Sequence, residues 1–322
     1  MRLPTGSTIP ASGDREGGIT VAVDFYKPSL SDRIFNIVVF LLATFSLVIV
    51  LYPLILVVSS SFSDGNSIVM GKVLLLPVNA NLGGYKEIFG YQSVFIGYAN
   101  AILYMVVGTL LNLTVSILMA YPLSRLDLKG RKFLTLLLIF TMLFNAGLIP
   151  NYLLMRDLNL INSRLVMILP KAINAYNIIV MITYFRGNVA RELLEATKID
   201  GCSDFRFVTA ILIPISKPII AVMTLFFAMG HWNSYFDAMI YLNSSSKFPL
   251  QLVLKEILLQ NQITPDMMST MNLTAEEMAM RMGLSQQLKY ALIVVSSVPL
   301  MILYPFIQKY FVKGVMIGSI KG

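Results

Sequence analysis

The residues of this sequence best suited to contact chemistry lie in a charged segment, Glu195–Pro214, between two apolar runs. The triplet Glu195-Ala196-Thr197 is followed after three residues by Gly201, and nine further residues lead to Ile211. Small side chains in the triplet allow a partner surface to approach closely. Gly201 lacks a Cβ, so the chain can turn sharply there through a positive φ. Neighbouring carboxylates and cations can form charged contacts at an interface that moves. This pattern favours docking to another protein over bond-making chemistry, and the alternative reading is an ordinary solvated loop.

The expected docking residues share this segment and the turn before it. They are Glu192, Glu195, Ala196, Thr197, Asp200, Gly201, Ile211 and Pro214.

The sequence contains little that could act as a catalytic centre. No stretch matches the glycine-rich loop ending in Lys and Ser or Thr that cradles nucleotide phosphates. His231 is the only histidine and Cys202 the only cysteine, so we expect no metal cluster and no internal disulfide. We expect a chain that is not an enzyme and holds no cofactor, and energy for any active process must come from a partner.

The composition indicates an integral membrane protein. Hydrophobic residues make up 56% of the 322-residue chain and charged residues only 13%, against about a quarter charged in soluble domains. Lipid offers no hydrogen-bond partners to the backbone, so continuous apolar spans must be helical. We therefore expect an all-α fold with six transmembrane helices, each of about 20 residues or more. The expected spans are 34–59, 97–122, 133–155, 165–185, 218–242 and 288–311.

Basic residues predict the orientation of these spans. Lys and Arg are more numerous in the tails and the even-numbered loops than in the others, and such residues favour the cytoplasmic side. We expect a cytoplasmic tail at 1–32, a six-helix domain at 33–312 whose coupling loop is 186–217, and a cytoplasmic tail at 313–322 that is flexible at Gly318–Gly322. The net charge of +8 follows this membrane pattern and calls for no nucleic acid.

Several polar residues lie within or at the ends of the spans, where polar groups usually face the bundle interior or a water-filled path. Neutral amides and phenols suit the hydroxyls of a sugar. The alternative role for these residues, and for Asn112, is hydrogen bonding between helices. Lys171 either binds an anionic sugar or extends its ammonium to the lipid headgroups. The candidate path residues are Asn145, Asn174, Asn177, Trp232, Asn233, Tyr235 and Asp237.

Two local features are predicted outside the loop. Gly147 and Pro150 should break the third span near its outer end. The outside segment 243–287 should carry a short amphipathic helix with the sequence TAEEMAMRMG.

The segment beginning at Glu195 resembles the EAA loop of membrane subunits in binding-protein-dependent ABC importers, with Thr197 in place of Ala and Ile213 in place of Leu. Further motifs follow in the order found in sugar-importer permeases of the maltose-importer G-subunit type. They are SSFSDG at 60–65, Gly84-Tyr85, AYPLSR at 120–125, GLIPNYLL at 147–154, LNLINS at 158–163, WNSYFDAMIYL at 232–242 and the terminal Lys321-Gly322. Several resemble the branch that takes up oligosaccharides from complex polysaccharides. Ala146 and Asn159 stand where that branch would have glycines.

The resemblance implies a type I ABC importer permease in a bacterial cytoplasmic or inner membrane, moving oligosaccharides by alternating access. It implies a heterodimer with a second permease, two ATPase subunits that bind ATP and Mg, and an extracytoplasmic solute-binding protein. The loop at Glu195 would form a short helix, a glycine turn and a second helix that dock into the ATPase. Gly318, Lys321 and Gly322 would touch the ATPases.

Two other classes of membrane protein fit the residues less well. An ion-coupled secondary transporter usually places charged relays within its spans, and only Lys171 and Asp237 qualify here. An intramembrane enzyme needs paired carboxylates, a Ser–His pair or a metal cluster, and the spans supply none in register.

Overall fold

The computed structural model describes residues 29–261 and 274–319. The chain divides into two units, 1–51 and 52–322, which are described separately. The first unit contributes most of α1 (Leu30–Ser61), whose apolar side chains are largely exposed, as a lipid-facing helix requires. The tail predicted at 1–32 lies outside the described residues up to residue 28.

The second unit is helical throughout its described part, with no strand there. Its helices are α2 (Gly65–Val69), α3 (Gly83–Gly90), α4 (Gln92–Ser124), α5 (Arg131–Leu143), α6 (Leu148–Asp157), η1 (Arg164–Met167), η2 (Leu169–Lys171), α7 (Ala175–Asn188), α8 (Arg191–Ile199), α9 (Asp204–Phe207), η3 (Val208–Leu212), α10 (Ile213–Ile215), α11 (Lys217–Trp232), α12 (Tyr235–Tyr241), η4 (Ser245–Lys247), α13 (Leu250–Gln260) and α15 (Ala275–Ser319).

The described helices include three that are long and apolar enough to cross a membrane unbroken: α1, α4 and the part of α15 from Ala279 to Phe306. Three bent pairs meet the same test when each pair is taken together: α5 with α6, η1 and η2 with α7, and α9–α10 with α11. Residues 29–261 and 274–319 therefore hold three such segments, or up to six if each bent pair forms one span.

The bends have local causes. Between α5 and α6 the chain turns by 111°, and Gly147 sits there at φ +85°, which confirms a break at this glycine. Pro150, in contrast, lies inside the first turn of α6, where its missing N–H is harmless. Asn159 adopts φ +56°, so an asparagine occupies a left-handed position that glycine would otherwise suit.

The predicted fourth and fifth spans are not single helices. Residues 164–171 form two 3₁₀ turns, with Pro170 in the second, and α7 begins only after the side chain of Asn174 caps it. The helix expected over 218–242 ends at Trp232, and α12 follows as a separate element. A proline removes a helical N–H and helps to explain the first interruption.

The outside segment and the carboxyl end also differ from expectation. The predicted short amphipathic helix is the beginning of α15. α15 continues to Ser319, past residue 312, where the six-helix domain was expected to end, and it includes Gly318, which was expected to be flexible. Sequence reasoning missed α13, which buries Leu250, Val253 and Ile257. Lys321 and Gly322 lie outside the described residues.

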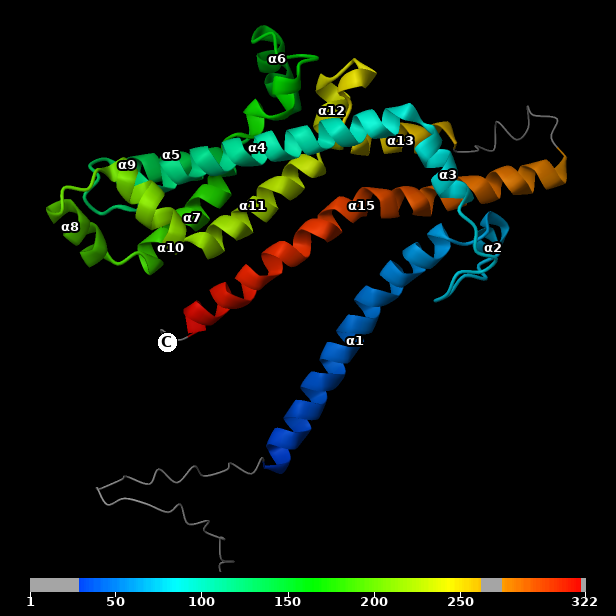
Figure 1. The fold of residues 1–322 in the computed structure, drawn as a ribbon, viewed down its shortest axis with the longest axis horizontal. Coiled ribbons are helices and arrows are strands. Elements are labelled where there is room, and N and C mark those ends of the chain that lie inside the picture. The colour runs from blue at the N-terminus through cyan, green and yellow to red at the C-terminus, as the bar shows by residue number, and fades with distance from the viewer. Residues whose placement is uncertain (1–28, 262–273, 320–322) are drawn as a thin grey trace, which may run out of the picture. The chain divides into compact units, whose positions relative to one another are not determined.

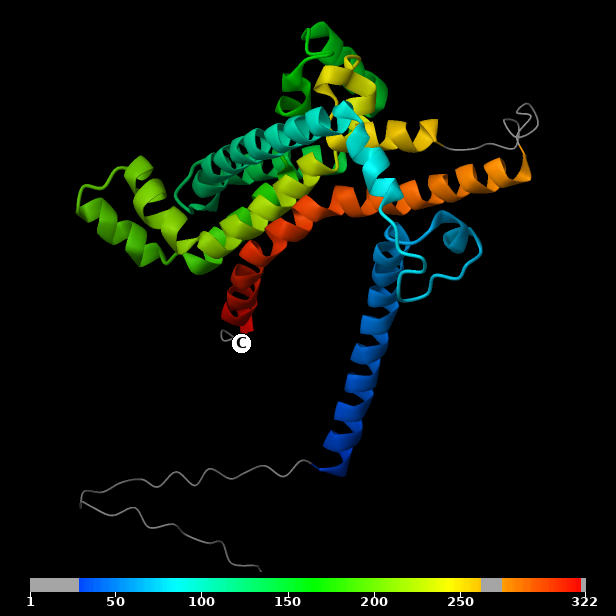
Figure 2. The same ribbon diagram turned by 45° about the vertical axis from the view of Figure 1, so that its right-hand side comes forward.

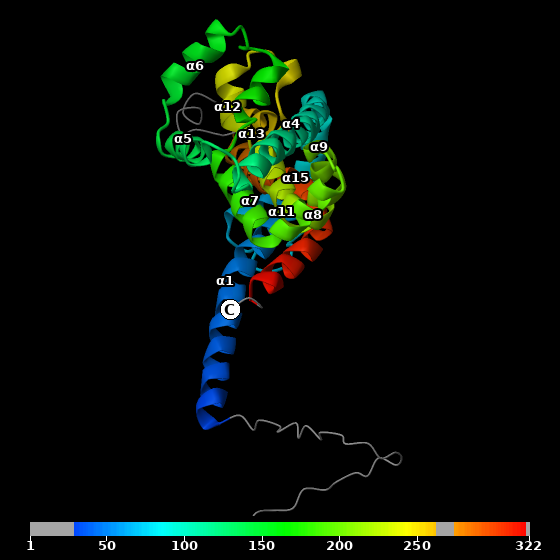
Figure 3. The same ribbon diagram turned by 90° about the vertical axis from the view of Figure 1, so that its left-hand side faces the viewer.

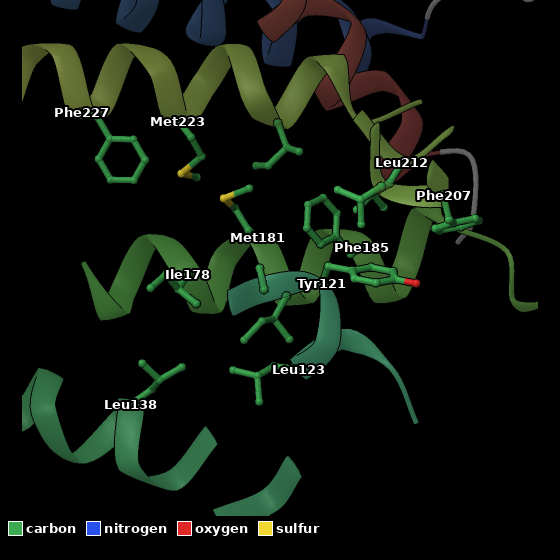
Figure 4. Close-up of a cluster of buried hydrophobic side chains, with 14 residues drawn as sticks. Tyr121, Leu123, Leu138, Ile178, Met181, Phe185, Phe207, Leu212, Met223 and Phe227 are labelled. Atoms are coloured by element: carbon green, nitrogen blue, oxygen red, sulfur yellow. The ribbon is translucent and has the colours of Figure 1, made fainter. Parts of the chain in front are cut away.

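The core joins α4, α7 and α11, which pack side by side (Figures 1 and 2). Met181 of α7 faces Met223 of α11, while Leu138 of α5 points toward Ile178 (Figure 4). A second buried cluster links α4 and α13 to α15 around Trp232. These contacts hold the helices that lead into the charged loop as one packed group.

The loops separate to opposite ends of this group. α8 lies at one end, and α12 and α13 lie toward the other (Figure 1). Figure 3 shows α6 turned away from α5 on the side of α12. Four helix ends share the α8 end: the end of α4, the start of α5, the end of α7 and the start of α11. The docking segment therefore lies away from α12 and its candidate path residues.

Candidate partner-docking and coupling site

The docking segment folds as a helix, a glycine turn and a second short helix. α8 ends at Ile199 with Asp200 as its C-cap, and Gly201 follows at φ +73°. The Gly201 N–H bonds the carbonyl of Lys198 at 3.1 Å, and the Cys202 N–H bonds that of Thr197 at 2.9 Å. This paired closure is the Schellman arrangement, which requires a left-handed residue just after the helix. The Ser203 side chain then accepts from the Arg206 N–H and caps α9.

The outer surface of this segment combines apolar and charged side chains. Ile199 is 87% exposed and Phe205 is 74% exposed, although both are large apolar residues. Ala196 is exposed on the same helix, and Glu195 pairs with Arg191 at 2.9 Å. Exposed apolar tips beside charges are typical of a surface that a partner protein covers.

The segment is connected to the second span by a charged network. Arg125, at the end of α4, donates to Asp204 at 2.6 Å and to both oxygens of Asp127, while Tyr121 donates to Asp204 at 3.0 Å. Arg125 is only 15% exposed, and its hydrogen bonds hold the pKa of Asp127 below the ordinary value. One guanidinium therefore links Asp204 of α9 to the end of α4.

A proline and a π turn continue the segment toward the fifth span. The Ile213 N–H bonds the carbonyl of Val208 five residues back, which widens the helix at η3. Pro214 follows in α10 and has no N–H to offer. After Ser216 the axis bends by 86° into α11. Ile211 is half-buried and packs against the α4–α7–α11 core, so it anchors the segment from inside.

A cavity of about 550 Å³ lies beside α8. The ends of α4 and α7 line it together with the inward face of α8, through residues that include Tyr121, Arg125, Phe185, Arg186 and Leu194. Glu192, in the first turn of α8, is exposed outside this lining. The structure thus places every predicted docking residue on one segment, and it adds Arg125 and Tyr121, which the spacing of the loop gave no reason to select.

Three of the candidate path residues are held by hydrogen bonds within the chain. Asn145 accepts from the Gly147 N–H, and Asn174 caps α7 by accepting from the N–H of Asn177. Trp232 is fully buried, and its indole donates to the Ser296 carbonyl at 3.0 Å. These side chains have structural partners in the chain itself.

The remaining polar residues gather where η2 meets α11 and α12. Lys171 pairs with Asp237 at 2.5 Å, and both side chains are about one-third exposed, at 34% and 32%. The Nδ2 group of buried Asn112 donates to the Lys171 carbonyl, and its Oδ1 accepts from Nε2 of His231 at 2.7 Å. Tyr235 lies under the ammonium of Lys255, which is 4.5 Å from the ring centroid, and Asn233 is exposed nearby in sequence. Sequence reasoning did not select Lys255.

Within the described residues, no group of three His, Cys, Asp or Glu side chains could hold a metal ion. The arrangement offers docking surfaces and hydrogen-bonding groups, and its charged pairs tie elements together.

Known proteins resemble this chain over nearly its whole length. No protein-family model matches it. The chain is 38% identical over 294 residues to the polygalacturonan/rhamnogalacturonan transport system permease protein YtcP of Bacillus subtilis, covering 91% of this chain and 100% of that protein. It is also 38% identical over 275 residues to protein LplC of the same species, covering 85% of this chain and 90% of LplC.

A solved structure agrees with these relatives. It is a crystal structure of a bacterial ABC transporter involved in the import of the acidic polysaccharide alginate. One of its chains is 36% identical and superposes with a TM-score of 0.75, covering 89% of this chain and 99% of that chain. A more distant relative, the arabinooligosaccharides transport system permease protein AraQ of Halalkalibacterium halodurans, is 26% identical over 279 residues, covering 85% of this chain and 92% of AraQ.

Proposed function

Because the chain belongs to the permease subunits of ABC transporters that import sugars and oligosaccharides, we propose that it moves acidic oligosaccharides inward and is driven through residues 186–217. It is a non-catalytic membrane component of such a system. The alternative of an ion-coupled transporter is not favoured, since the relatives are ABC permeases.

The observation that carries the coupling proposal is the exposed helix–glycine–helix of α8 and α9. Ile199 and Phe205 protrude from it although water contact with large apolar groups is unfavourable. A partner ATPase that covers this face would bury both side chains. Glu195 and Asp200 would then hold charged contacts at the rim. ATP and Mg would be bound by that partner, since this sequence has no phosphate-cradling loop.

The network at Arg125 supports a route from the docking segment into the membrane. When an ATPase pulls on α9, the Arg125–Asp204 ion pair would carry the displacement to the end of α4. The core of α4, α7 and α11 would follow as a packed body. Alternating access would then arise from movement of this body against a second permease chain.

The rest of the assembly follows from the same proposal. We infer six spans, with each bent pair crossing the bacterial cytoplasmic membrane once and both termini on the cytoplasmic side. A second permease chain, two ATPase subunits and an extracytoplasmic solute-binding protein complete the importer. Gly318, Lys321 and Gly322 would contact the ATPases.

The proposed substrate is an oligosaccharide that carries carboxylates. The named cargo of one relative is polygalacturonan or rhamnogalacturonan, and that of the structural neighbour is alginate, described as acidic. Lys171 pairs with Asp237 of α12, and the ammonium of Lys255 in α13 lies over the ring of Tyr235. Both α12 and α13 lie toward the end of the molecule opposite α8 (Figure 1). Because Asp237 already balances the charge of Lys171, the ammonium of Lys255 is the cation that suits a sugar whose charge is negative.

The test uses the complete complex in lipid nanodiscs with its solute-binding protein. Oligogalacturonides should stimulate ATP hydrolysis, and neutral oligosaccharides of equal length should not. Gly201→Val should abolish the stimulation, because a β-branched residue is strained at φ +73°. Gly201→Asn should retain it, since asparagine tolerates that conformation.

Two outcomes would overturn parts of this proposal. Stimulation that is equal in the valine and asparagine variants would refute the role of the turn. Stimulation by neutral sugars alone would refute the acidic substrate and leave the importer assignment in place.

A further inference from the structure

A small basic cavity lies between α5 and α7, outside the docking segment and the candidate path. Its volume is about 240 Å³. Arg131, Lys132 and Arg186 supply positive charge, and Thr135, Leu136 and Ile139 complete the lining. The three cations lie where α5 begins and α7 ends, so they share the α8 end of the bundle.

Two of the cations are held in place by the backbone. Arg131 donates to the carbonyl of Arg125 at 3.2 Å, and Arg186 donates to that of Leu123 at 2.8 Å. These bonds use one N–H of each guanidinium, which has five. Within the part of the chain that the structure describes, no carboxylate pairs with Arg131, Lys132 or Arg186. Three like charges are therefore kept near each other without an anion from this chain.

The other half of the cavity is apolar and exposed. Leu136 is 62% exposed and continues an exposed apolar face of α5 that includes Phe133 and Phe140. Ile139 lies one helical turn beyond Leu136 on the same lining. Thr135 lines the same cavity, and its Oγ1 atom is buried and has no hydrogen-bond partner. A ligand that fits has an anionic head, an oxygen acceptor at its neck and a hydrocarbon tail.

We propose that this cavity binds the headgroup of an anionic phospholipid. The phosphate would lie among Arg131, Lys132 and Arg186, an ester oxygen would accept from Thr135, and an acyl chain would run along Leu136 and Ile139. Basic pockets between transmembrane helices on the cytoplasmic side are suited to such headgroups. Scattered basic residues that only snorkel to the surface would have no pocket and no common ligand.

The site also has a consequence for coupling. Arg186 lines both this cavity and the larger cavity beside α8. A bound headgroup would hold the guanidinium on the α5 side and fix the end of α7 next to the docking segment. The expected effect is higher sugar-stimulated ATP hydrolysis in membranes that contain anionic lipid.

The test is lipid retention by the complete complex, measured by native mass spectrometry after purification from membranes containing phosphatidylglycerol. Lys132→Gln combined with Thr135→Val should retain one phosphatidylglycerol fewer per copy of this chain. Lys129→Gln is the matched control, since Lys129 is a neighbouring exposed cation that does not line the cavity. This readout does not depend on transport, so it can fail while the importer assignment stands.

Three results would overturn the proposal. The first is that the double variant retains as much lipid as the wild type. The second is that the Lys129 variant loses as much lipid as the double variant, which would indicate attraction to general surface charge. Inorganic phosphate at millimolar concentration could displace the retained lipid fully, which would identify a free anion as the ligand.

Discussion

Single residues decide how closely the helices of this permease approach each other. A Cβ on Gly108 of α4 would lie 2.3 Å from Nε2 of His231 on α11, a separation that real side chains do not show. His231 is 2% exposed and hydrogen-bonded to Asn112, so its ring has no room to withdraw. Glycine is therefore required at this helix crossing for its small size, whereas at Gly201 it is required for its conformation.

We expect Gly108→Ala to destabilise the complex by about 1–3 kcal/mol, the usual cost of an overpacked core. Gly230→Ala is the matched control on α11, since a Cβ there meets nothing within 4 Å. Thermal unfolding of the purified complex in nanodiscs should show a lower Tm for the first variant only. Equal Tm values for the two variants would show that α4 and α11 separate in the assembly.

The geometry of Arg125 matters as much as its charge. It joins Asp127 and Asp204 through separate nitrogens, which the ammonium of lysine cannot reproduce. Arg125→Lys should lower sugar transport several-fold per ATP hydrolysed, because α9 loses its connection to α4. Arg156→Lys is the control, since the Arg156–Asp157 pair is exposed and joins neighbouring residues. Unchanged transport per ATP in Arg125→Lys would place the coupling elsewhere.

The pH dependence of this network follows from the lowered pKa of Asp127, whose largest cause is the hydrogen bond from Arg125. A carboxyl with a lowered pKa contributes stability above its unfolded pKa of about 3.9 and loses it as the pH falls. Transport by the wild type should therefore show no titration of this pair between about pH 6 and 8. A transport step in that range that Asp127→Asn removes would contradict this assignment.

At the scale of elements, α15 remains continuous across a proline because neighbouring helices supply the missing hydrogen bond. Pro299 has no N–H for the carbonyl of Val295, four residues earlier. The hydroxyl of Tyr98 on α4 donates to that carbonyl at 2.7 Å. Trp232 on α11 donates to the next carbonyl, that of Ser296. The side chains of α4 and α11 therefore hydrogen-bond to α15 at the point where its own backbone hydrogen bonds are interrupted.

A double-mutant cycle tests this interpretation. Tyr98→Phe should cost about 1 kcal/mol, because the Val295 carbonyl is left without a donor. Pro299→Ala restores an N–H at the required position and should remove most of that cost. The measurement is the Tm of the four proteins in the same nanodiscs. Strict additivity of the two changes would show that the tyrosine and the proline act independently.

At the scale of the whole molecule, the apolar surface requires a bilayer and partners. Exposed large apolar residues cover α1 and the outer face of α5, and they also stand at the tips of the docking segment. Lipid accounts for the first two surfaces. The tips at Ile199 and Phe205 lie in a polar, charged segment, and a protein partner accounts for them better than lipid does.

Cys202 provides a natural reporter of this arrangement, because it is the only cysteine and lies in the docking segment, half-buried. A membrane-impermeant maleimide should label it in inverted vesicles that contain the permease pair alone, and not in right-side-out vesicles. Adding the ATPase subunits should protect it.

The control places a cysteine on the opposite end of the molecule. Ser245→Cys in a Cys202→Ser background should react only in right-side-out vesicles, since Ser245 is exposed in η4. Labelling of Cys202 from the outside would reverse the proposed orientation.

The sequence alone was sufficient for the class of the protein and for the conformation of its docking segment. A low fraction of charge and long apolar runs leave no soluble alternative, and spacing within Glu195–Pro214 is local information. The Schellman closure at Gly201 depends on neighbouring residues only, so it follows from local residue types. The glycine break at 147 was predictable for the same reason.

Only the tertiary structure decided the courses of the spans and the partners of the polar residues. Hydropathy measures apolar length and is insensitive to a bend, so it read residues 218–242 as one span although α11 ends at Trp232. The contacts Arg125–Asp204, Lys171–Asp237 and Tyr98–Val295 join residues far apart in the chain. Packing in three dimensions creates such pairs, so no local sequence pattern predicts them. The requirement for lipid follows from composition, and the docking loop follows from the spacing of its residues.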